Sequence, residues 1–519
     1  MNRTNLLSKI STDTRWDVVV VGGGATGLGV ALEASTRGYR TLLVEQHDFC
    51  KGTSSRSTKL VHGGVRYLSQ GNLRLVRDAL RERGLLLKNA PGLVRPLRLV
   101  VPIFSRWERL YYGTGLRFYD LLAGKLGLSW SQGLSVEATI EKIPTLKPDS
   151  LRGGILYLDA AFDDSRMGIA LARNAAGSGA VLVNYMRFAG FLKSDEKVCG
   201  VRLCEQFGGA EFEARARVVV NATGVFSDAV REMDSPREPR MLALSQGTHL
   251  VLPKRFLPRD FALMIPKTED GRVLFALPWH NRVLAGTTDV AVAEPQLEPR
   301  PGREEIRFIL EHLGHYLTER PTEADILSTF SGLRPLIQTR QGRTTAALGR
   351  DHSILVSNSS LVSILGGKWT TYRKMAEDAV DRAAEVGGLP QVDSCTADIS
   401  IEGPEVGDLY WPSGNDELGS LDSALEDTGL QEPLDADFPY TKADVVRAVR
   451  EEWACTLEDV LARRTRLLFL DARAAVRAGP QVASIITAEL GHGSNWESEQ
   501  VKEFIELAKG YLPEGAMTP

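Results

Sequence analysis

A glycine-rich turn near the start of the chain carries the first residue pattern with a clear chemical use. An apolar run leads into GGGATG at residues 22–27, a helix-forming stretch follows, and a second apolar strand ends in an acid, Glu45. Gly22 permits a sharp turn, Gly24 lets the backbone approach a pyrophosphate, and Gly27 lets the helix pack on the strand. Glu45 is placed to accept hydrogen bonds from a ribose diol. The pattern predicts a dinucleotide site and leaves nicotinamide or flavin open.

Small polar residues follow directly after this unit. The loop 52–59 is rich in serine, with Ser54 and Ser55 at its centre, and His62 stands beside a glycine pair. Hydroxyl groups and glycines so close to a phosphate turn suit contacts to a cofactor's diphosphate and ring. A plain surface loop with two turns is the alternative for such a composition. The position of the loop beside the glycine turn favours the cofactor.

The elements that must position these residues alternate in type along the chain. Residues 151–224 show strand, helix and strand again, and end in a second glycine-bearing strand end. Residues 241–328 hold short alternating segments with Pro and Gly turns, which predict an antiparallel sheet in a substrate-facing insertion. Residues 331–385 return to the first pattern, with a glycine pair at 366–367 before a helix start suited to an anion. We therefore expect an α/β sheet assembled from separated pieces.

One segment differs sharply from the rest in charge. Residues 71–125 hold eleven Lys or Arg against four acids, a net charge of +7 in a chain of net charge -4. Large apolar and aromatic residues such as Trp107, Tyr111 and Phe118 are interleaved with these charges. An anionic bilayer surface attracts this mixture. The alternative is an amphipathic helix that packs on the protein with its arginines in water. We hypothesise that the segment contacts a membrane surface.

Chain length, net charge and cysteine count limit the number of domains, the partners and the cellular compartment that can be expected. At 519 residues the chain should divide into two to four domains, and a net charge of -4 gives no global reason to expect a nucleic-acid partner. The five cysteines form no CxxC pair, so neither a disulfide framework nor a metal site is indicated, and a reducing cytoplasm fits best. The first 15 residues lack the apolar core of a secretion signal, and no later run reaches the roughly 18 apolar residues of a spanning helix. The expectation is a protein that is soluble or lies on a membrane.

The last part of the chain has its own character. Residues 402–435 are rich in Gly, Pro and Ser and are predicted to be a linker. Beyond the linker, residues 441–449 and 456–469 have helical spacing, and the segment 456–459 is a plausible helix cap. A final helix-rich domain is expected.

Longer motifs carry a family resemblance. The stretch VVVVGGGATGLGVALEASTRGYRTLLVEQHDFCKGTSSRSTKLVHGGVRYL is followed by YLDAAFDDSRM, VVNATGVFSD, GTHLVLP, FALPW, AGTTD, SGLRPL, GGKWTTYRKMAEDA and EEWACTLEDVLARRTRLLFLD. Together they resemble the FAD-dependent glycerol-3-phosphate dehydrogenases of the aerobic, respiratory type, over about residues 14–400 and 435–485. HGGVRYL and GGKWTTYR in this order are more specific than the glycine turn, and they favour flavin over nicotinamide.

The resemblance implies a fold. We expect an α/β protein with an FAD-binding Rossmann-like domain, an inserted antiparallel-sheet substrate domain and a C-terminal all-helical domain. The predicted bounds are 1–90, 150–240 and 330–400 for the discontinuous FAD-binding domain, 91–149 and 241–329 for the substrate or cap domain, and 401–519 for the linker and C-terminal helical domain.

The resemblance also implies a reaction. Members of this family oxidise sn-glycerol 3-phosphate to dihydroxyacetone phosphate by hydride transfer to FAD and pass the electrons to a membrane quinone. The same is expected here, with peripheral attachment to an anionic membrane surface, cytoplasmic and on the inner face of the cell membrane, and a possible homodimer. An oxidase of the same fold that uses oxygen, another FAD-dependent amine or hydroxy-acid oxidoreductase, and a flavin-bound scaffold without catalysis are the alternatives.

Site residues carry over motif by motif. Arg66, Tyr67, Arg334 and Lys368 match substrate-binding positions, since three cations and a phenol suit a phosphate dianion. His249 in GTHLVLP is the candidate proton acceptor and is grouped with Arg334 and Lys368 as catalytic; Arg334 or a water is the alternative acceptor. The implied FAD contacts are Gly22, Gly24, Gly27, Glu45, Ser54, Ser55, Lys59, His62, Gly224 and Thr370.

Overall fold

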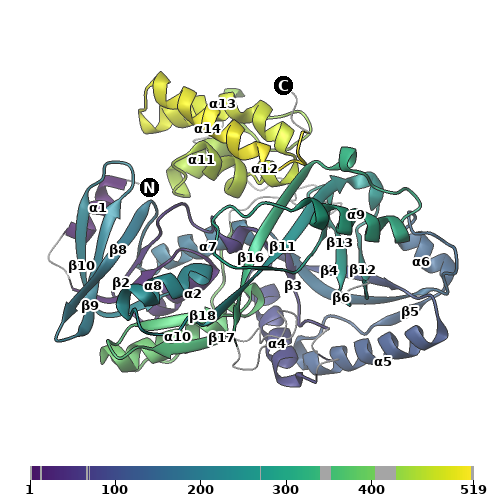
Figure 1. Ribbon diagram of the computed structural model, residues 1–519, viewed down its shortest axis with the longest axis horizontal. Coiled ribbons are helices and arrows are strands. Elements are labelled where there is room, and N and C mark those ends of the chain that lie inside the picture. The colour runs from purple at the N-terminus through teal and green to yellow at the C-terminus, as the bar shows by residue number, and fades with distance from the viewer. Residues whose placement is uncertain are drawn as a thin grey trace.

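Two β-sheets, each assembled from separated parts of the chain, organise the protein (Figure 1). The computed structural model describes residues 3–11, 15–65, 68, 71–268, 271–338, 352–403 and 428–515. The sheets lie side by side, and the C-terminal helices sit across one end of both (Figure 1).

The first sheet grows out of the glycine turn. Its strands are β1 (Trp16–Val21), β2 (Thr41–Val44), β7 (Val181–Val183), β10 (Glu211–Asn221), β17 (His352–Val356) and β18 (Val362–Gly366). They run in the order β17-β18-β10-β1-β2-β7, parallel except for β17 at the edge. Val18 and Val20 belong to the core on one face, and Val19 and Val21 to the core on the other. Burial on both faces explains the continuous apolar run in the sequence.

Helices and a hairpin cover this sheet. They are α1 (Arg3–Ser11), α2 (Ala25–Thr36), α7 (Asp164–Gly177), α8 (Ser227–Asp234) and α10 (Tyr372–Gly387), with β8 (Met186–Ser194) and β9 (Lys197–Glu205) in the hairpin. Helix α2 begins at the glycine turn and packs against α7 and α10, and β9 pairs with β10. The strand and helix pattern predicted for 151–224 is confirmed.

The second sheet is the predicted insertion. Its strands are β3 (Leu60–Val61), β4 (Val94–Pro102), β5 (Gln132–Leu134), β6 (Gly154–Phe162), β11 (Leu242–Pro253), β12 (Phe261–Ile265), β13 (Leu274–Trp279), β14 (Arg282–Gly286), β15 (Val290–Val292) and β16 (Ser328–Ile337). The order is β15-β11-β14-β13-β12-β4-β6-β3, with β16 on β11 and β5 on β6. The pairing is antiparallel, as predicted, except that β12 runs parallel to β4. Strands β3, β6 and β16 come from segments that the predicted bounds give to the FAD-binding domain, so the chain crosses between the sheets more often than those bounds imply.

Helices flank the second sheet, and 3₁₀ turns connect the elements. The helices are α4 (Leu73–Asn89), α5 (Arg106–Ala123), α6 (Val136–Lys142) and α9 (Arg303–Tyr316). The 3₁₀ turns are η1 (Thr53–Ser55), η2 (Gly124–Leu126), η3 (Gly224–Phe226), η4 (Lys254–Phe256), η5 (Glu323–Asp325), η7 (Trp369–Thr371) and η10 (Thr428–Gln431). Helices α4 and α5 pack on each other beneath the second sheet (Figure 1). Within the described ranges, no helix has the length and apolar character needed to cross a membrane.

The C-terminal region is helical, as expected. It comprises α11 (Lys442–Glu451), the π-helical segment η11 (Asp459–Arg464), α12 (Leu467–Leu470), α13 (Ala472–Leu490) and α14 (Ser494–Lys509). The single helix expected over 456–469 is instead broken at Arg466, whose φ is +62°. Phe469 shares one buried cluster with Phe330 and Trp279 of the second sheet, which docks the domain there. Most of the predicted linker, 404–427, lies outside the described residues.

Candidate active site

The glycine turn has the geometry that its sequence predicts. Gly22 has φ +108°, a conformation that favours glycine, and a Cβ there would lie 2.7 Å from the carbonyl oxygen of Ala222. A Cβ on Gly27 would overlap the Gly22 carbonyl oxygen, and one on Gly24 would lie 3.0 Å from Ser54 Oγ. The turn is therefore closed by β10 on one side and by the serine loop on the other. Gly224, with φ +58°, follows directly on that end of β10.

Glu45 lies at the end of β2, facing this turn. Its carboxylate accepts hydrogen bonds from the backbone N–H of Gly23 at 2.7 Å and of His47 at 3.0 Å. Burial raises the pKa of Glu45, and those two N–H groups oppose the shift. The carboxylate is thus fixed beside the phosphate turn, where a ribose contact was predicted.

The serine loop and η7 close over the start of α2. Ser54 Oγ accepts from the N–H of Ala25 at 2.9 Å, and the Trp369 indole N–H donates to the Ser54 carbonyl at 2.8 Å. Thr370 Oγ1 accepts from the N–H of His62 at 3.3 Å. Two segments separated by some 300 residues in sequence therefore meet where the cofactor contacts were predicted.

A cavity of about 280 Å³ opens between this junction and the second sheet. Its lining brings together five of the predicted residues: His62, His249, Arg334, Lys368 and Thr370. Apolar side chains from the second sheet, among them Leu99, Met264 and Phe275, form part of the wall. The cavity combines cations, two histidines and an apolar wall, which suits a small anionic ligand held next to a ring system.

His249, on β11, is held in one orientation. It is 2% exposed, stacks on the Phe330 ring at a centroid distance of 5.0 Å, and its Nε2 lies 2.9 Å from Thr58 Oγ1. Among the described residues its Nδ1 has no hydrogen-bond partner. Burial first, and then the charges of Lys59 and Arg334, hold the pKa of His249 well below its usual value. The imidazole is therefore neutral at physiological pH and can accept a proton.

Arg334, on β16, is braced by the loop after β14. Its Nη2 donates to Thr287 Oγ1 at 3.0 Å and its Nη1 to the Thr288 carbonyl at 3.1 Å. A Cβ on Gly247 would meet the guanidinium, so glycine at this position leaves room for Arg334 to take its observed place. Lys368 reaches the same cavity from the loop before η7. Two cations from different elements thus face one cavity.

Two residues predicted to contact FAD are turned away from the cavity, and the structure does not describe two residues predicted to bind substrate. Lys59 is 1% exposed, and its ammonium pairs with Asp164 at 2.6 Å rather than facing the cavity. Ser55 is also buried, and its carbonyl accepts from the Lys59 ammonium at 2.8 Å. Arg66 and Tyr67 lie outside the described residues.

Sequence reasoning missed several residues that line the cavity. They include Thr58, Asp159, Arg272 and Thr287. Asp159 lies in the motif YLDAAFDDSRM, which was recognised without a role for this carboxylate. Burial raises the pKa of Asp159 to about 6 against the opposing effect of Arg83, 2.7 Å away. Thr58 lies in the loop 52–59 that was expected to contact the cofactor, whereas no sequence spacing signals Thr287, which reaches the cavity only through the fold of the second sheet.

Comparisons with known proteins show which family the chain belongs to. A family model described as FAD dependent oxidoreductase matches residues 17–373, and one described as the C-terminal domain of alpha-glycerophosphate oxidase matches residues 413–501. The mitochondrial glycerol-3-phosphate dehydrogenase of Homo sapiens is 38% identical over 98% of this chain and 75% of its own length. The corresponding Arabidopsis thaliana protein is 39% identical over 96% of this chain and 86% of its own length. The chain belongs to the FAD-dependent glycerol-3-phosphate dehydrogenases.

Solved structures agree with that assignment. The glycerol-3-phosphate dehydrogenase from Bacillus halodurans, solved in complex with FAD, matches with a TM-score of 0.76 and 26% identity, covering 100% of this chain and 99% of that one. The L-alpha-glycerophosphate oxidase from Mycoplasma pneumoniae, with FAD bound, has a TM-score of 0.59 at 17% identity, over 73% of this chain and 96% of that one, and shares the fold. The predicted fold class, enzyme class and FAD cofactor are confirmed.

The residues of this chain fit FAD. A turn with no Cβ at Gly22, Gly24 and Gly27 leads into the N-terminus of α2, which suits a diphosphate. Glu45 at the end of β2 suits the ribose, and the cavity beside His62 and Thr370 suits the reacting end of the ring. Bound there, the cofactor supplies a two-electron acceptor to the cavity.

Proposed function

We propose that this glycerol-3-phosphate dehydrogenase oxidises sn-glycerol 3-phosphate to dihydroxyacetone phosphate with FAD and passes the electrons to a membrane quinone. The observation that carries the proposal is the cavity in which Arg334, Lys368 and the neutral His249 meet beside the predicted cofactor contacts. The names of the relatives, 38% identical over nearly the whole chain, point to the same substrate.

Each group has a role that follows from its chemistry. Arg334 and Lys368 bind the phosphate dianion, because a guanidinium braced at two positions donates in a fixed fork and an ammonium adds charge. His249 accepts the proton of the C2 hydroxyl, since its imidazole is neutral and positioned. The C2 hydrogen leaves as a hydride, so that two electrons and two hydrogens are removed and a ketone is formed. The apolar wall excludes water from the reacting carbon.

The first experiment tests substrate and cofactor together. Purified holoenzyme is mixed anaerobically with glycerol 3-phosphate, and the flavin absorbance is followed. We expect bleaching with this substrate and none with glycerate or amino acids, which would indicate another oxidoreductase of the fold. Absence of bleaching with glycerol 3-phosphate overturns the proposal.

Oxygen is the second candidate acceptor. The C-terminal family model carries the description of an oxidase, and the solved oxidase shares the fold. The reduced enzyme is therefore offered a soluble quinone or oxygen in parallel. Rapid reoxidation by quinone without peroxide supports the dehydrogenase, whereas peroxide formed in step with substrate loss supports the oxidase.

Helix α5 carries an exposed apolar face suited to contact the membrane that holds the quinone. Trp107, Leu110 and Leu121 are 72%, 60% and 62% exposed, and their spacing puts them on one side of the helix. The opposite side, with Leu116 and Tyr119, is buried. A helix with one face in the core and a second apolar face in solvent suits a bilayer interface.

Cations border this apolar face. Arg106 and Arg117 of α5 are exposed beside it, and Arg74 and Arg77 are exposed on α4, the helix that packs on α5. Positive charge beside an apolar stripe favours an anionic lipid surface. We therefore propose peripheral attachment on the inner, cytoplasmic face of the cell membrane through α4 and α5. The homodimer expected from the sequence stays a prediction.

A further inference from the structure

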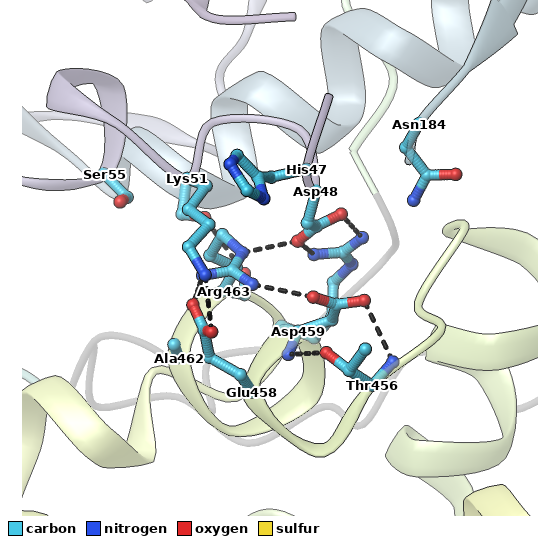
Figure 2. Close-up of polar contacts among 12 residues, drawn as sticks. His47, Asp48, Lys51, Ser55, Asn184, Thr456, Glu458, Asp459, Ala462 and Arg463 are labelled. Atoms are coloured by element: carbon cyan, nitrogen blue, oxygen red, sulfur yellow. Dashed lines mark hydrogen bonds and ion pairs between the residues drawn. The ribbon is translucent and has the colours of Figure 1, made fainter. Parts of the chain in front are cut away.

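The loop between β2 and β3 carries the residues that face the cofactor turn, and the C-terminal domain anchors it. Lys51 pairs with Glu458 at 2.6 Å (Figure 2). Asp48, which is fully buried, accepts from the Arg464 guanidinium at 2.7 and 2.9 Å and also pairs with Arg463. Buried charges persist only where they are paired, so these contacts require the C-terminal domain to be docked.

A second anchor lies deeper, at Arg466. This side chain is fully buried, with its guanidinium 4.4 Å from the centre of the Phe469 ring. Its Nη2 donates to the Ser55 carbonyl at 3.0 Å and to Asp164 Oδ1 at 3.1 Å, and its Nη1 donates to the Ala462 carbonyl at 2.9 Å. One planar guanidinium thus ties the C-terminal domain to the loop and to the first turn of α7.

Asp164 binds the same loop through its other carboxylate oxygen. Its Oδ2 accepts from the Ser57 N–H at 3.0 Å, from Ser57 Oγ at 2.7 Å and from the Lys59 ammonium at 2.6 Å. Thr58 stands between these two anchored residues, and its hydroxyl lies 2.9 Å from Nε2 of His249. Both neighbours of Thr58 are held by one carboxylate, which Arg466 in turn holds.

The contact between the Thr58 hydroxyl and Nε2 fixes the orientation of the His249 ring. When Nε2–H donates to Thr58 Oγ1, Nδ1 keeps its lone pair, and Nδ1 has no hydrogen-bond partner among the described residues. The hydroxyl can also donate to Nε2, so this contact orients the ring in either tautomer.

We propose that Arg466, acting through Asp164 and the loop 55–59, is a positioning residue that places the Thr58 hydroxyl and so holds the His249 imidazole in the orientation that the reaction needs. The proposal rests on the function proposed above for His249. It makes the C-terminal helical domain part of the catalytic geometry, although Arg466 itself touches neither substrate nor flavin.

The test is a double-mutant cycle on the holoenzyme. Arg466→Lys keeps the charge but loses the planar fork, and Thr58→Val removes the hydroxyl at similar volume. Each is expected to slow flavin reduction at saturating glycerol 3-phosphate by roughly three- to tenfold, as one lost hydrogen bond does, with the substrate dissociation constant unchanged. The double variant should be no slower than the slower single one, because both changes break one chain of contacts.

The control is Arg477→Lys, an exposed residue of the same domain that pairs with Asp435 and should change neither quantity. If Arg466→Lys does not fold, Ser57→Ala replaces it in the cycle, since Ser57 meets the same carboxylate. The proposal is overturned if the two single-variant losses in the rate of flavin reduction multiply in the double variant. It is also overturned if Arg466→Lys loses thermal stability but reduces flavin at the wild-type rate. Failure of the wild-type enzyme to bleach is a different outcome, and it removes the proposed function itself.

Discussion

At the scale of single residues, His249 determines the pH dependence of the reaction. Its pKa is lowered by burial and by Lys59 and Arg334, so the neutral form prevails from below pH 6.5 upward. We predict that the rate of flavin reduction is flat above pH 6.5 and falls only at lower pH, where the imidazole takes up a proton. His249→Gln should reduce the rate about 10²–10⁴-fold, as loss of a general base does. Anaerobic stopped-flow reduction across the pH range measures both effects.

The matched control is His492→Gln, because His492 is exposed and stacks on Trp496 in the C-terminal domain. It should reduce flavin at the wild-type rate. A His249→Gln enzyme with full activity would assign the proton to another acceptor, with Arg334 or a water as the remaining choices.

Arg334 should act on binding of the phosphate. Arg334→Lys keeps a positive charge but cannot keep both hydrogen bonds, to Thr287 Oγ1 and to the Thr288 carbonyl. We expect the dissociation constant of glycerol 3-phosphate to rise about tenfold or more, because a charge-assisted hydrogen bond contributes about 1.5–3 kcal/mol. Titration of flavin absorbance with an unreactive phosphate ester measures the constant directly. Unchanged affinity would place the phosphate elsewhere.

At the scale of elements, the glycine turn is the feature whose role in cofactor binding follows most directly from its sequence. Gly27→Ala would drive a Cβ into the Gly22 carbonyl oxygen, where backbone cannot give way cheaply. We predict loss of bound FAD, measured as the flavin-to-protein ratio, together with a lower thermal unfolding temperature.

Gly115→Ala in α5 is the control, since its Cβ meets nothing within 4 Å. That change should leave the flavin content intact, and a helical alanine should stabilise the protein by about 0.5–1 kcal/mol. Full flavin content in Gly27→Ala would contradict the role given to the turn.

The same elements show what the sequence could and could not predict. The turn at Gly22 was predictable because strand, turn and helix are contiguous, and each glycine answers a local steric demand. Lys59 was predicted to bind the cofactor from the family resemblance, yet its partner is Asp164, 105 residues away. The break at Arg466 was missed because no glycine or proline marks it in the sequence, and its partner Asp164 lies 302 residues away. Long-range pairing of charges leaves no periodic trace in a sequence.

At the scale of the whole molecule, the two sheets form the site, and the C-terminal helices support it from outside the cavity. The first sheet supplies the nucleotide turn, the second sheet supplies His249 and Arg334, and the C-terminal helices hold the loop between them. The shared buried cluster of Trp279, Phe330 and Phe469 makes this docking apolar as well as ionic. Removing the C-terminal domain should therefore affect flavin reduction as well as stability.

The exposed face of α5 sets the position of the molecule relative to the membrane, and with it access to quinone. The double variant Trp107→Ser, Leu110→Ser removes two large exposed side chains. Each such side chain gains about 1.5–3 kcal/mol of free energy when it moves from water into an apolar environment. We predict that the variant no longer sediments with anionic vesicles, while glycerol 3-phosphate still bleaches its flavin. Reoxidation by quinone held in the vesicles should slow, and reoxidation by a soluble quinone should not.

Met233→Ser on α8 is the matched control, because Met233 is 51% exposed but has no apolar stripe beside it on that short helix. It should sediment like the wild type, and sedimentation should weaken with added salt, since exposed Arg74 and Arg77 contribute through a screened potential. A wild-type enzyme that stays in the supernatant with anionic vesicles would exclude α5 as the attachment surface. In that case electrons would have to leave the flavin for an acceptor in solution, and the oxidase reaction would become the better account of the same cavity.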